Sequence, residues 1–250
     1  MNAGEGAPAG LEIRELSKAF GPLAALDRVD LIAPAGEFVT IIGPSGCGKS
    51  TLFNIIAGLD EPDAGRVTIG GRAGGRRAGR VAYMPQKDLL LPWRTTLDNV
   101  ILPLEIRGVP RGRARREALA LFPEFGLAGF ERAYPAALSG GMRQRAAFLR
   151  TTLAGGEILL LDEPFGALDA LTRGRLQEWL LGVWERRRRT TLFITHDVDE
   201  AIFLADRVFV MSPRPGRIVL EGVVDLPRPR DAAMLTAPAF VALKAALLAT

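Results

Sequence analysis

The segment GPSGCGKST at residues 43–51 combines three glycines with a lysine and three hydroxyl side chains, directly after the apolar run EFVTII. Its spacing matches G-x-x-x-x-G-K-[ST], in which glycines let consecutive backbone N–H groups turn toward one anion. The following stretch KSTLFNIIAG predicts a helix, whose N-terminus adds about half a positive charge. Lys49 is expected to reach the β- and γ-phosphates of a nucleoside triphosphate, and Ser50 to offer its hydroxyl to Mg²⁺.

Further groups that could act on a phosphate follow other apolar runs. ILLLDEP ends in Asp162, which suits a water-mediated hold on Mg²⁺, and Glu163, which suits a general base that polarises the attacking water. Gln86 follows a predicted strand in AYMPQKD and could complete the magnesium shell, and His196, the single histidine, ends the run FITHD. Because parallel strands end at one edge of a sheet, these groups are expected to gather near Lys49. The plainer alternative is that the two acids cap the next helix and that the histidine is structural.

The segment LSGGM at residues 138–142 is a second candidate anion site, because Ser139 and two glycines precede an amphipathic helix. It offers a hydroxyl and bare backbone amides but no lysine. If this loop cannot fold back onto residues 43–51 of its own chain, it must serve the nucleotide of another molecule. A simple helix cap at Ser139 is the plainer alternative.

Cys47 is the only cysteine of the chain and lies between Gly46 and Gly48 of the phosphate-binding segment. An internal disulfide is therefore impossible, which fits a reducing compartment. Because a helix N-terminus can make a thiol more reactive, we expect Cys47 to react with a maleimide and to be protected by Mg-ATP. The alternative is that its side chain points into the core behind the loop.

The elements that would position these groups are visible as apolar runs. EFVTIIG, GEILLLDEP and TTLFITHD are continuous, which is typical of strands buried on both faces of a parallel sheet. LEIREL, LDRVDLIA and RVTIG alternate, so the first part of the chain is expected to be rich in β-structure. RLQEWLLGVWERRRR has helical spacing, and its four closing arginines suit the negative end of a helix. The apolar face of that helix is expected to hold Leu176, Trp179, Leu180, Val183 and Trp184.

The order of these runs divides the chain into three parts. Residues 1–10 read as a flexible lead, residues 11–222 as one α/β domain, and residues 223–250 as a short C-terminal tail. Residues from about 88 to 155 look helical and are punctuated by prolines, which predicts an inserted α-helical subdomain. The expected fold is α/β, with a mostly parallel sheet, an N-terminal antiparallel β subdomain and this insertion.

The overall composition limits the class of protein. With 250 residues and 48% hydrophobic content, the chain can bury a sizeable core. No apolar run approaches the roughly 18 residues that span a bilayer, and no signal-peptide stretch opens the sequence. We therefore expect it to stay in the cytoplasm unless a partner takes it to a membrane. The net charge is +4, and basic runs such as RGVPRGRARRE could bind nucleic acid or anionic lipid. They lack interleaved aromatics, which favours a solvated surface.

Taken together, these motifs resemble those of the ATP-binding subunit of an ATP-binding cassette (ABC) transporter over about residues 11–222. GPSGCGKST resembles the Walker A motif, ILLLDE the Walker B motif, and LSGGM the family signature loop. Gln86 resembles the Q-loop glutamine, ALD at 167–169 the D-loop, His196 the switch histidine, and Phe20 in SKAFG the aromatic that stacks on adenine. Met142 departs from the pattern, because the family most often has glutamine there, and this puts contacts on the ribose side in doubt.

The resemblance implies a P-loop NTPase core that binds ATP and Mg²⁺, with roles for named residues. The residues assigned to nucleotide binding are Phe20, Gly43, Pro44, Ser45, Gly46, Cys47, Gly48, Lys49, Ser50 and Thr51. The signature loop, which would act on the nucleotide of the partner cassette (in trans), is Leu138, Ser139, Gly140, Gly141 and Met142, and the D-loop is Ala167, Leu168 and Asp169. The residues assigned to catalysis are Glu163, His196 and Gln86, and those assigned to magnesium binding are Ser50, Gln86 and Asp162.

The resemblance also implies partners. Two cassettes, either a homodimer or this chain paired with a similar one, would close head to tail around two ATP molecules. Two transmembrane permease subunits and an extracytoplasmic substrate-binding protein would complete the transporter, at the cytoplasmic face of the cell (inner) membrane. QKDLLLPWRTTLDNVILPLEIRGVPR is similar to importer cassettes of the nitrate, sulfonate, taurine and pyrimidine-precursor group, and its Trp93 is a candidate for docking the permease. No nucleic-acid partner is expected.

Three alternatives remain open on the sequence alone. An ABC exporter or lipoprotein-release ATPase would share the same core motifs. A soluble ABC ATPase of translation or DNA repair would suit the basic pI, but it would carry a second cassette or long coiled-coil or zinc insertions. A P-loop GTPase or kinase would leave LSGG unexplained, and no N-K-x-D guanine motif occurs in the sequence.

Overall fold

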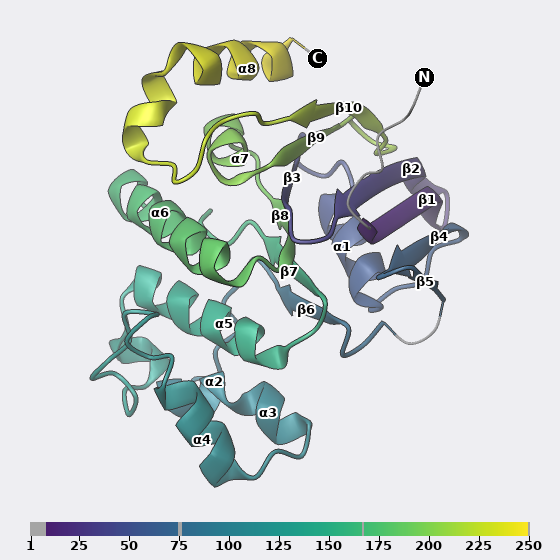
Figure 1. The fold of residues 1–250 in the computed structure, drawn as a ribbon. Helices are drawn as coiled ribbons and strands as arrows, with labels where there is room; N and C mark the ends of the chain where they lie inside the picture. The colour runs from purple at the N-terminus through teal and green to yellow at the C-terminus, as the bar shows by residue number, and fades with distance from the viewer. Residues whose placement is uncertain (1–8, 75–76, 167, 250) are drawn as a thin grey trace.

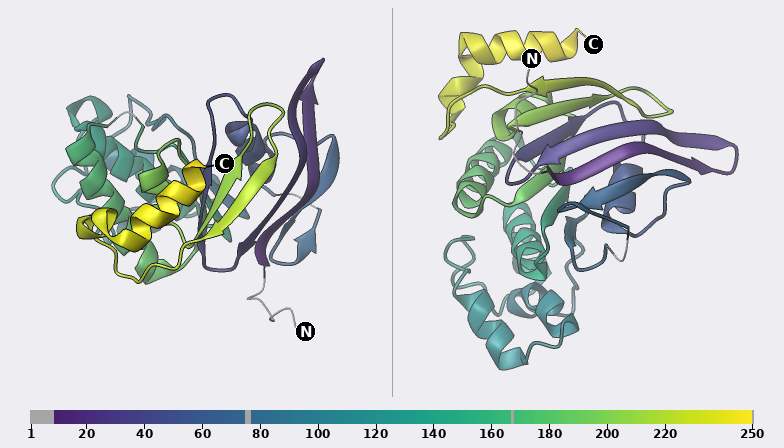
Figure 2. Two further views of the ribbon diagram at one scale, coloured as in Figure 1. Left: turned by 90° about the horizontal axis from the view of Figure 1, so that it is seen from above. Right: turned by 45° about the vertical axis from the view of Figure 1, so that its right-hand side comes forward.

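The computed structural model describes residues 9–74, 77–166 and 168–249 as two β-sheets with helices packed mainly on one side (Figure 1). A four-stranded sheet has the strand order β2-β1-β4-β5, and a six-stranded sheet has the order β10-β9-β3-β8-β7-β6. Figure 2 shows that most helices lie on one side of the six-stranded sheet and the four-stranded sheet on the other. The predicted α/β class, with one antiparallel and one mostly parallel sheet, is confirmed.

The four-stranded sheet is antiparallel. Its strands are β1 (Ala9–Phe20), β2 (Leu23–Pro34), β4 (Ala64–Ile69) and β5 (Arg72–Ala73). β1 and β2 form one long hairpin, and β2 buries alternate residues such as Val29, Leu31 and Ala33. This alternation leaves one face of the hairpin for the core and one for solvent. The hairpin turn places Phe20 and Leu23 at one end of the sheet.

The six-stranded sheet contains the continuous apolar runs. Its strands are β3 (Phe38–Ile42), β6 (Val81–Met84), β7 (Ile158–Asp162), β8 (Thr190–Ile194), β9 (Arg207–Met211) and β10 (Ile218–Val223). All neighbours pair in parallel except β10, which runs antiparallel to β9 at the edge. Every residue of β3, β7 and β8 is buried, as their continuous apolar sequences predict.

Two hydrophobic cores flank this sheet. In the core shared with the four-stranded sheet, α1 (Lys49–Ala57) contributes Leu52, Phe53 and Ile56. The second core contains residues of α5 (Gly140–Ala154), α6 (Ala170–Arg187), α7 (Val198–Leu204) and α8 (Pro238–Leu248), and it continues into the helices between residues 96 and 119. The sheet is thus held rigidly from both faces, which fixes the positions of its strand ends.

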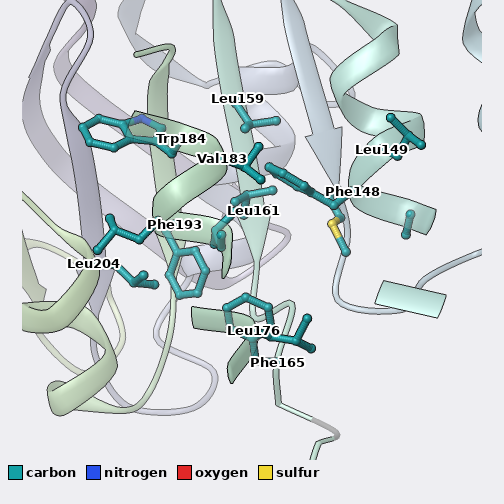
Figure 3. Close-up of a cluster of buried hydrophobic side chains, with 14 of the residues drawn as sticks. Phe148, Leu149, Leu159, Leu161, Phe165, Leu176, Val183, Trp184, Phe193 and Leu204 are labelled. Atoms are coloured by element: carbon teal, nitrogen blue, oxygen red, sulfur yellow. The ribbon is translucent and has the colours of Figure 1, made fainter. Parts of the chain in front are cut away.

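The apolar face predicted for residues 175–189 is confirmed in α6. Trp184 is 3% exposed, and its ring meets Phe38 of β3 edge to face at a centroid distance of 5.5 Å. Figure 3 shows Trp184 and Val183 beside side chains of the sheet such as Leu161 and Phe193. The tryptophans therefore serve packing, as the helical spacing indicates.

The four arginines at residues 186–189 were expected to close this helix, and the structure places only two of them inside it. α6 ends at Arg187, so only Arg186 and Arg187 lie in its last turn. Both pair with Glu124 of the helical insertion, at 3.0 and 2.8 Å. Arg188 adopts a left-handed cap, and its guanidinium lies 4.7 Å from the Trp184 ring centroid. The run therefore joins α6 to the insertion and covers Trp184, beyond any effect of the helix dipole.

In Figure 1 most of the helical insertion extends away from both sheets, while its last helix, α5, packs against β6. It contains α2 (Thr96–Val100), α3 (Leu102–Ile106), α4 (Arg111–Leu119), a 3₁₀ turn (Pro135–Ala137) and α5. Buried Asn99 accepts from Leu91 N at 2.7 Å and donates to Leu91 O and Arg94 O at 3.0 and 3.1 Å. These bonds fix the loop between β6 and α2, and they leave Trp93 at its tip 72% exposed.

The C-terminal tail packs onto the second core. A 3₁₀ turn (Ala232–Thr236) leads into α8, which buries Phe240 and Leu247. Lys244 of α8 pairs with Asp199 of α7 at 2.7 Å. None of the helices in the described part of the chain combines the length and the apolar character that crossing a membrane requires.

Candidate nucleotide-binding site

A cleft of about 310 Å³ opens where the β1–β2 hairpin meets the loop after β3. It collects residues from five separate parts of the sequence. Its lining comprises Phe20, Leu23, Ala25, Ser45, Gly46, Gly48, Lys49, Ser50, Thr51, Gln86, Glu163 and Arg214. Seven residues predicted to bind the nucleotide and two predicted to act in catalysis therefore line the same cleft, as the common edge of the strands predicts.

The loop before α1 has the geometry of an anion cradle. Gly48 is the N-cap residue of α1 with φ 112°, and no described side chain caps the helix. Gly46 is also left-handed, with φ 75°. A Cβ on Gly48 would lie 2.9 Å from Ala25 O, so glycine is required there by both conformation and space. The uncapped N–H groups and the helix dipole favour a phosphate at this end.

Lys49 is the cation of the cradle. Lys49 is 6% exposed, and its Nζ donates to Gly43 O at 2.8 Å and Pro44 O at 3.0 Å. The ammonium is therefore held inside the loop by two neutral acceptors. A phosphate oxygen is a stronger acceptor for the same donors, because charge-assisted hydrogen bonds are about twice as strong as neutral ones.

Cys47 does not behave as predicted. It is 1% exposed and belongs to the core between the two sheets. Its backbone stays in the cradle, but its side chain points away from the cleft, and a Cβ built on Gly43 would lie 3.2 Å from its Sγ. The expectation of a maleimide-reactive thiol is therefore wrong, because the left-handed glycines on both sides turn this side chain inward.

Asp162 lies under the cradle at the end of β7. It is 4% exposed, and it accepts a hydrogen bond from the Tyr83 hydroxyl at 3.2 Å. Burial raises the pKa of Asp162, and hydrogen bonds from the hydroxyls of Ser50 and Tyr83 oppose that rise. Burial, with the neighbouring Asp162, raises the pKa of Tyr83 and keeps its hydroxyl a donor. The Ser50 contact brings the predicted magnesium ligands of Walker A and Walker B together.

Glu163, Gln86 and His196 converge at the next position. Glu163 Oε2 accepts from Gln86 Nε2 at 3.2 Å and lies 3.5 Å from His196 Nδ1. Glu163 has φ 43°, a left-handed conformation that is costly for a residue with a side chain and is concentrated at functional sites. The three groups that the sequence analysis assigned to catalysis thus meet through one carboxylate oxygen.

The donor set fits Mg²⁺. Ser50 offers a hydroxyl oxygen, Asp162 a carboxylate and Gln86 an amide oxygen, and Mg²⁺ prefers such oxygen ligands together with phosphate and water. Within the described ranges, no three or more His, Cys, Asp or Glu side chains cluster as an all-protein metal site.

The signature loop lies outside this cleft. Ser139 is exposed and is the N-cap of α5, where its Oγ accepts from Met142 N at 3.3 Å. None of residues 138–142 lines the nucleotide cleft. Leu168 of the D-loop lies next to it, with Cδ2 3.2 Å from the position of a Cβ on Gly140. The structure therefore separates the two candidate phosphate loops within one chain.

The D-loop is described in part. Ala167 lies outside the described residues, whereas Asp169 is the N-cap of α6 and accepts from Thr172 N at 3.0 Å. That backbone hydrogen bond lowers the pKa of Asp169. Asp169 therefore starts the helix that borders the signature loop.

Several lining residues were missed by the sequence analysis. Leu23 and Ala25 of β2 form the apolar wall beside Phe20, and Arg214 reaches the cleft from the turn between β9 and β10. Tyr83 holds Asp162 from β6. The hairpin turn after Phe20 was the one local signal for the apolar wall; Arg214 is one of 28 arginines and carried no local signal.

Comparisons with known proteins show which family the chain resembles. A family model described as ABC transporter matches residues 26–166. The chain is 45% identical over 222 residues to the formylaminopyrimidine import ATP-binding protein ThiZ of Halalkalibacterium halodurans, covering 88% of this chain and 85% of that protein. It is 48% identical over 204 residues to the taurine import ATP-binding protein TauB of Rhizobium johnstonii, covering 82% and 78%.

A solved structure supports the same relationship. The dimeric structure of MJ0796, a bacterial ABC transporter cassette, matches with a TM-score of 0.75 at 30% identity, covering 87% of this chain and 100% of that chain. The same cassette in a post-hydrolysis dimer bound to ADP and Pi matches with a TM-score of 0.74.

Proposed function

This chain belongs to the ABC transporter family as an ATP-binding subunit, and we propose that its cleft hydrolyses ATP with Glu163 as the general base. The subunit binds and hydrolyses ATP and uses that energy to power solute import. One observation carries the assignment of its residues: a single cleft is lined by Phe20, the P-loop, Lys49, Gln86 and Glu163. The aromatic ring, the phosphate cradle and the base of this cleft are the groups proposed to contact the adenine, the phosphates and the attacking water.

Glu163 has the support that a base needs. Gln86 and His196 both approach Oε2, so the carboxylate is held in one orientation at the end of β7. A general base must be fixed within hydrogen-bond reach of the water it polarises. Gln86 and His196 are therefore proposed as the groups that orient the carboxylate and respond to the γ-phosphate.

Lys49 and Ser50 are proposed to bind the phosphates. Lys49 exchanges the carbonyls of Gly43 and Pro44 for phosphate oxygens, so its charge is not left without partners at any stage. When Mg²⁺ is bound, Ser50, Asp162 and Gln86 would hold it, and the ion neutralises charge that develops on the phosphates.

The signature loop is proposed to act on the ATP of another cassette. Ser139 Oγ accepts from Met142 N, and the same hydroxyl still has a proton to donate to a phosphate. Because residues 138–142 do not line the cleft of their own chain, that phosphate belongs to a partner cassette. The dimeric MJ0796 cassette supports such a pairing. ATP then stabilises the closed dimer by mass action.

The membrane partners are proposed to dock near the β6–α2 loop. Leu89 and Trp93 follow Gln86 in the sequence and are 57% and 72% exposed, and exposed apolar groups of this size often mark an interaction site. The import ATP-binding proteins among the relatives favour an importer over an exporter or lipoprotein-release ATPase. The complete assembly would add two permease subunits and an extracytoplasmic binding protein, with this chain at the cytoplasmic face of the inner membrane.

The change Glu163→Gln tests this proposal. It should keep ATP binding, lower turnover by about 10²- to 10⁴-fold, the usual contribution of a positioned base, and accumulate an ATP-bound dimer. Glu157→Gln is the matched control, because Glu157 precedes the same strand and pairs with Arg80 instead of facing the cleft. ATPase assays and size-exclusion chromatography with ATP measure both effects. Near-normal turnover of the Glu163 variant would move the base elsewhere, with His196 first in line.

A further inference from the structure

The turn at residues 212–217, between β9 and β10, contacts both walls of the nucleotide cleft. Figure 1 shows the β9–β10 hairpin beside β2. The turn is internally tight: Ser212 N donates to Arg217 O at 2.9 Å, and Ser212 Oγ accepts from Arg217 N at 3.0 Å. Ser212 Oγ also donates to Pro213 O at 2.9 Å. A turn closed by its own hydrogen bonds can transmit position between the elements it contacts.

One side of the turn is bonded to β2. Gly216 N donates to Ala25 O at 3.0 Å, Asp27 N donates to Gly216 O at 3.1 Å, and Arg217 pairs with Asp27. Ala25 belongs to the apolar wall of the cleft beside Phe20. The turn is therefore fixed to the wall proposed to receive adenine.

The other side of the turn is bonded to the P-loop. Arg214 donates twice to the carbonyl oxygen of Gly46, from Nε at 3.1 Å and from Nη2 at 2.7 Å. Gly216 lies so close to the carbonyl of Cys47 that an added Cβ would overlap that oxygen. Two successive P-loop carbonyls thus face the turn.

These contacts restrict the P-loop at Gly46, a residue type with high conformational freedom. The peptide between Gly46 and Cys47 is held at both ends, because its carbonyl accepts from Arg214 and its N–H donates to Pro44 O at 3.3 Å. Gly46 has φ 75°, and glycine loses more conformational freedom on ordering than any other residue. Fixing this peptide before nucleotide arrives lowers the entropy cost of binding.

We propose that the 212–217 turn holds the P-loop at a fixed spacing from the β2 wall, with Arg214 as the positioning residue for the phosphate cradle. The proposal rests on the proposed function of the cleft, since it concerns the same ATP. Arg214 acts through Gly46 rather than by touching the reacting atoms. It therefore sets affinity for ATP, whereas Glu163 sets turnover.

The experiment measures equilibrium binding of Mg-ATP to the full chain carrying Arg214→Ala. We expect Kd to rise about three- to tenfold, the range for losing charged hydrogen bonds at a partly exposed site. Arg214→Lys keeps one charged donor and should recover part of the affinity. The unfolding midpoint should not change, because Arg214 is exposed.

Arg186→Ala is the matched control. Arg186 also donates twice, from Nε and Nη2 at 3.2 and 3.0 Å, but its acceptor is Glu124 and it does not line the cleft. Its variant should bind ATP as the unchanged chain does. The Arg214→Ala penalty should also persist between about 0.05 and 0.5 M salt, whereas a long-range charge effect would be screened.

Gly216→Ala is the second variant, because its added Cβ must push the turn off the Cys47 carbonyl. It should also weaken ATP binding. Unchanged ATP affinity in both Arg214→Ala and Gly216→Ala, or a penalty that disappears at the higher salt concentration, overturns the proposal. Normal turnover in Glu163→Gln together with weakened binding in Arg214→Ala would instead remove the proposed base and leave the positioning role standing.

Discussion

The N-termini of α1 and α5 are two versions of one physical device. Each helix begins after small residues, and its N-terminus offers backbone amides and the helix dipole to an anion. At α1, Gly48 leaves the amides free of any described side-chain cap, and Lys49 supplies a charge. At α5, Ser139 caps its own helix, and no residue of its loop reaches the nucleotide cleft.

This difference is the basis of the proposal that each binding site is divided between two chains. The α1 end has a cation, the apolar wall proposed to receive adenine and nearby acids, so the proposed function has it bind the nucleotide by itself. The α5 end has only a hydroxyl and amides, so it can stabilise a phosphate that is already bound elsewhere. A site split in this way links nucleotide binding to association of two cassettes.

The largest expected effects come from disabling each helix end in turn. Lys49→Ala should weaken ATP binding to the isolated chain by about 10- to 100-fold, because charged hydrogen bonds to phosphate are lost. Ser139→Arg should leave that affinity within about twofold and abolish hydrolysis, because an added cation and side chain block the paired site. Equilibrium binding and ATPase assays separate the two outcomes.

Ser139→Thr sharpens the same contrast. Threonine keeps the hydroxyl that caps Met142 N, so both helix and hydrolysis should survive in large part. If Ser139→Arg weakened ATP binding to the isolated monomer as much as Lys49→Ala does, the division between the two helix ends would be wrong.

A smaller effect is expected at the adenine wall. Phe20 is 49% exposed on the hairpin turn, and Phe20→Ala should weaken ATP binding about five- to tenfold, within the range for base stacking on an aromatic ring. Phe20→Tyr should keep most of the affinity. Competition by tripolyphosphate, which has no base, provides the internal control, and an equal loss for tripolyphosphate would argue against stacking.

The docking surface should respond without any change in the cleft. Trp93→Ala should weaken co-purification with the permease while ATP binding and the unfolding midpoint stay constant, because this side chain is 72% exposed. Trp184→Ala is the contrast, since removing a buried tryptophan costs about 3–5 kcal/mol of stability. Loss of folding in the Trp93 variant would show that Trp93 serves packing instead.

At Cys47 we expect no maleimide labelling of the native chain, with or without Mg-ATP, because this residue is 1% exposed. Mass spectrometry after labelling checks this, and urea-unfolded chain gives the positive control. Rapid labelling of the native protein would mean that the P-loop opens away from the core.

Much of the fold follows from local sequence patterns. The buried strands β3, β7 and β8 appear as continuous apolar runs, and the face of α6 that contains Trp184 appears as helical spacing. Glu163, Gln86 and His196 could be grouped because each follows a strand whose carboxyl end shares one edge. These are properties that neighbouring residues determine together.

Other parts of the site could not be predicted, because they depend on contacts between distant segments. Arg214 reaches Gly46 across 168 positions, and nothing near it distinguishes it from other exposed arginines. The orientation of Cys47 depends on the left-handed glycines beside it and on the core that receives its side chain. Tertiary packing, rather than local preference, decides both.

The most direct test of the divided site is complementation between two inactive chains. A Lys49→Ala chain keeps its signature loop, and a Ser139→Arg chain keeps its P-loop, so a mixed dimer contains one intact composite site. The mixture should hydrolyse ATP, whereas each variant alone should not. As control, a Lys49→Ala chain mixed with a Lys49→Ala, Ser139→Arg double variant has no intact pairing and should stay inactive. A Lys49→Ala and Ser139→Arg mixture with no more activity than the sum of its parts would contradict a signature loop that acts on the partner's ATP.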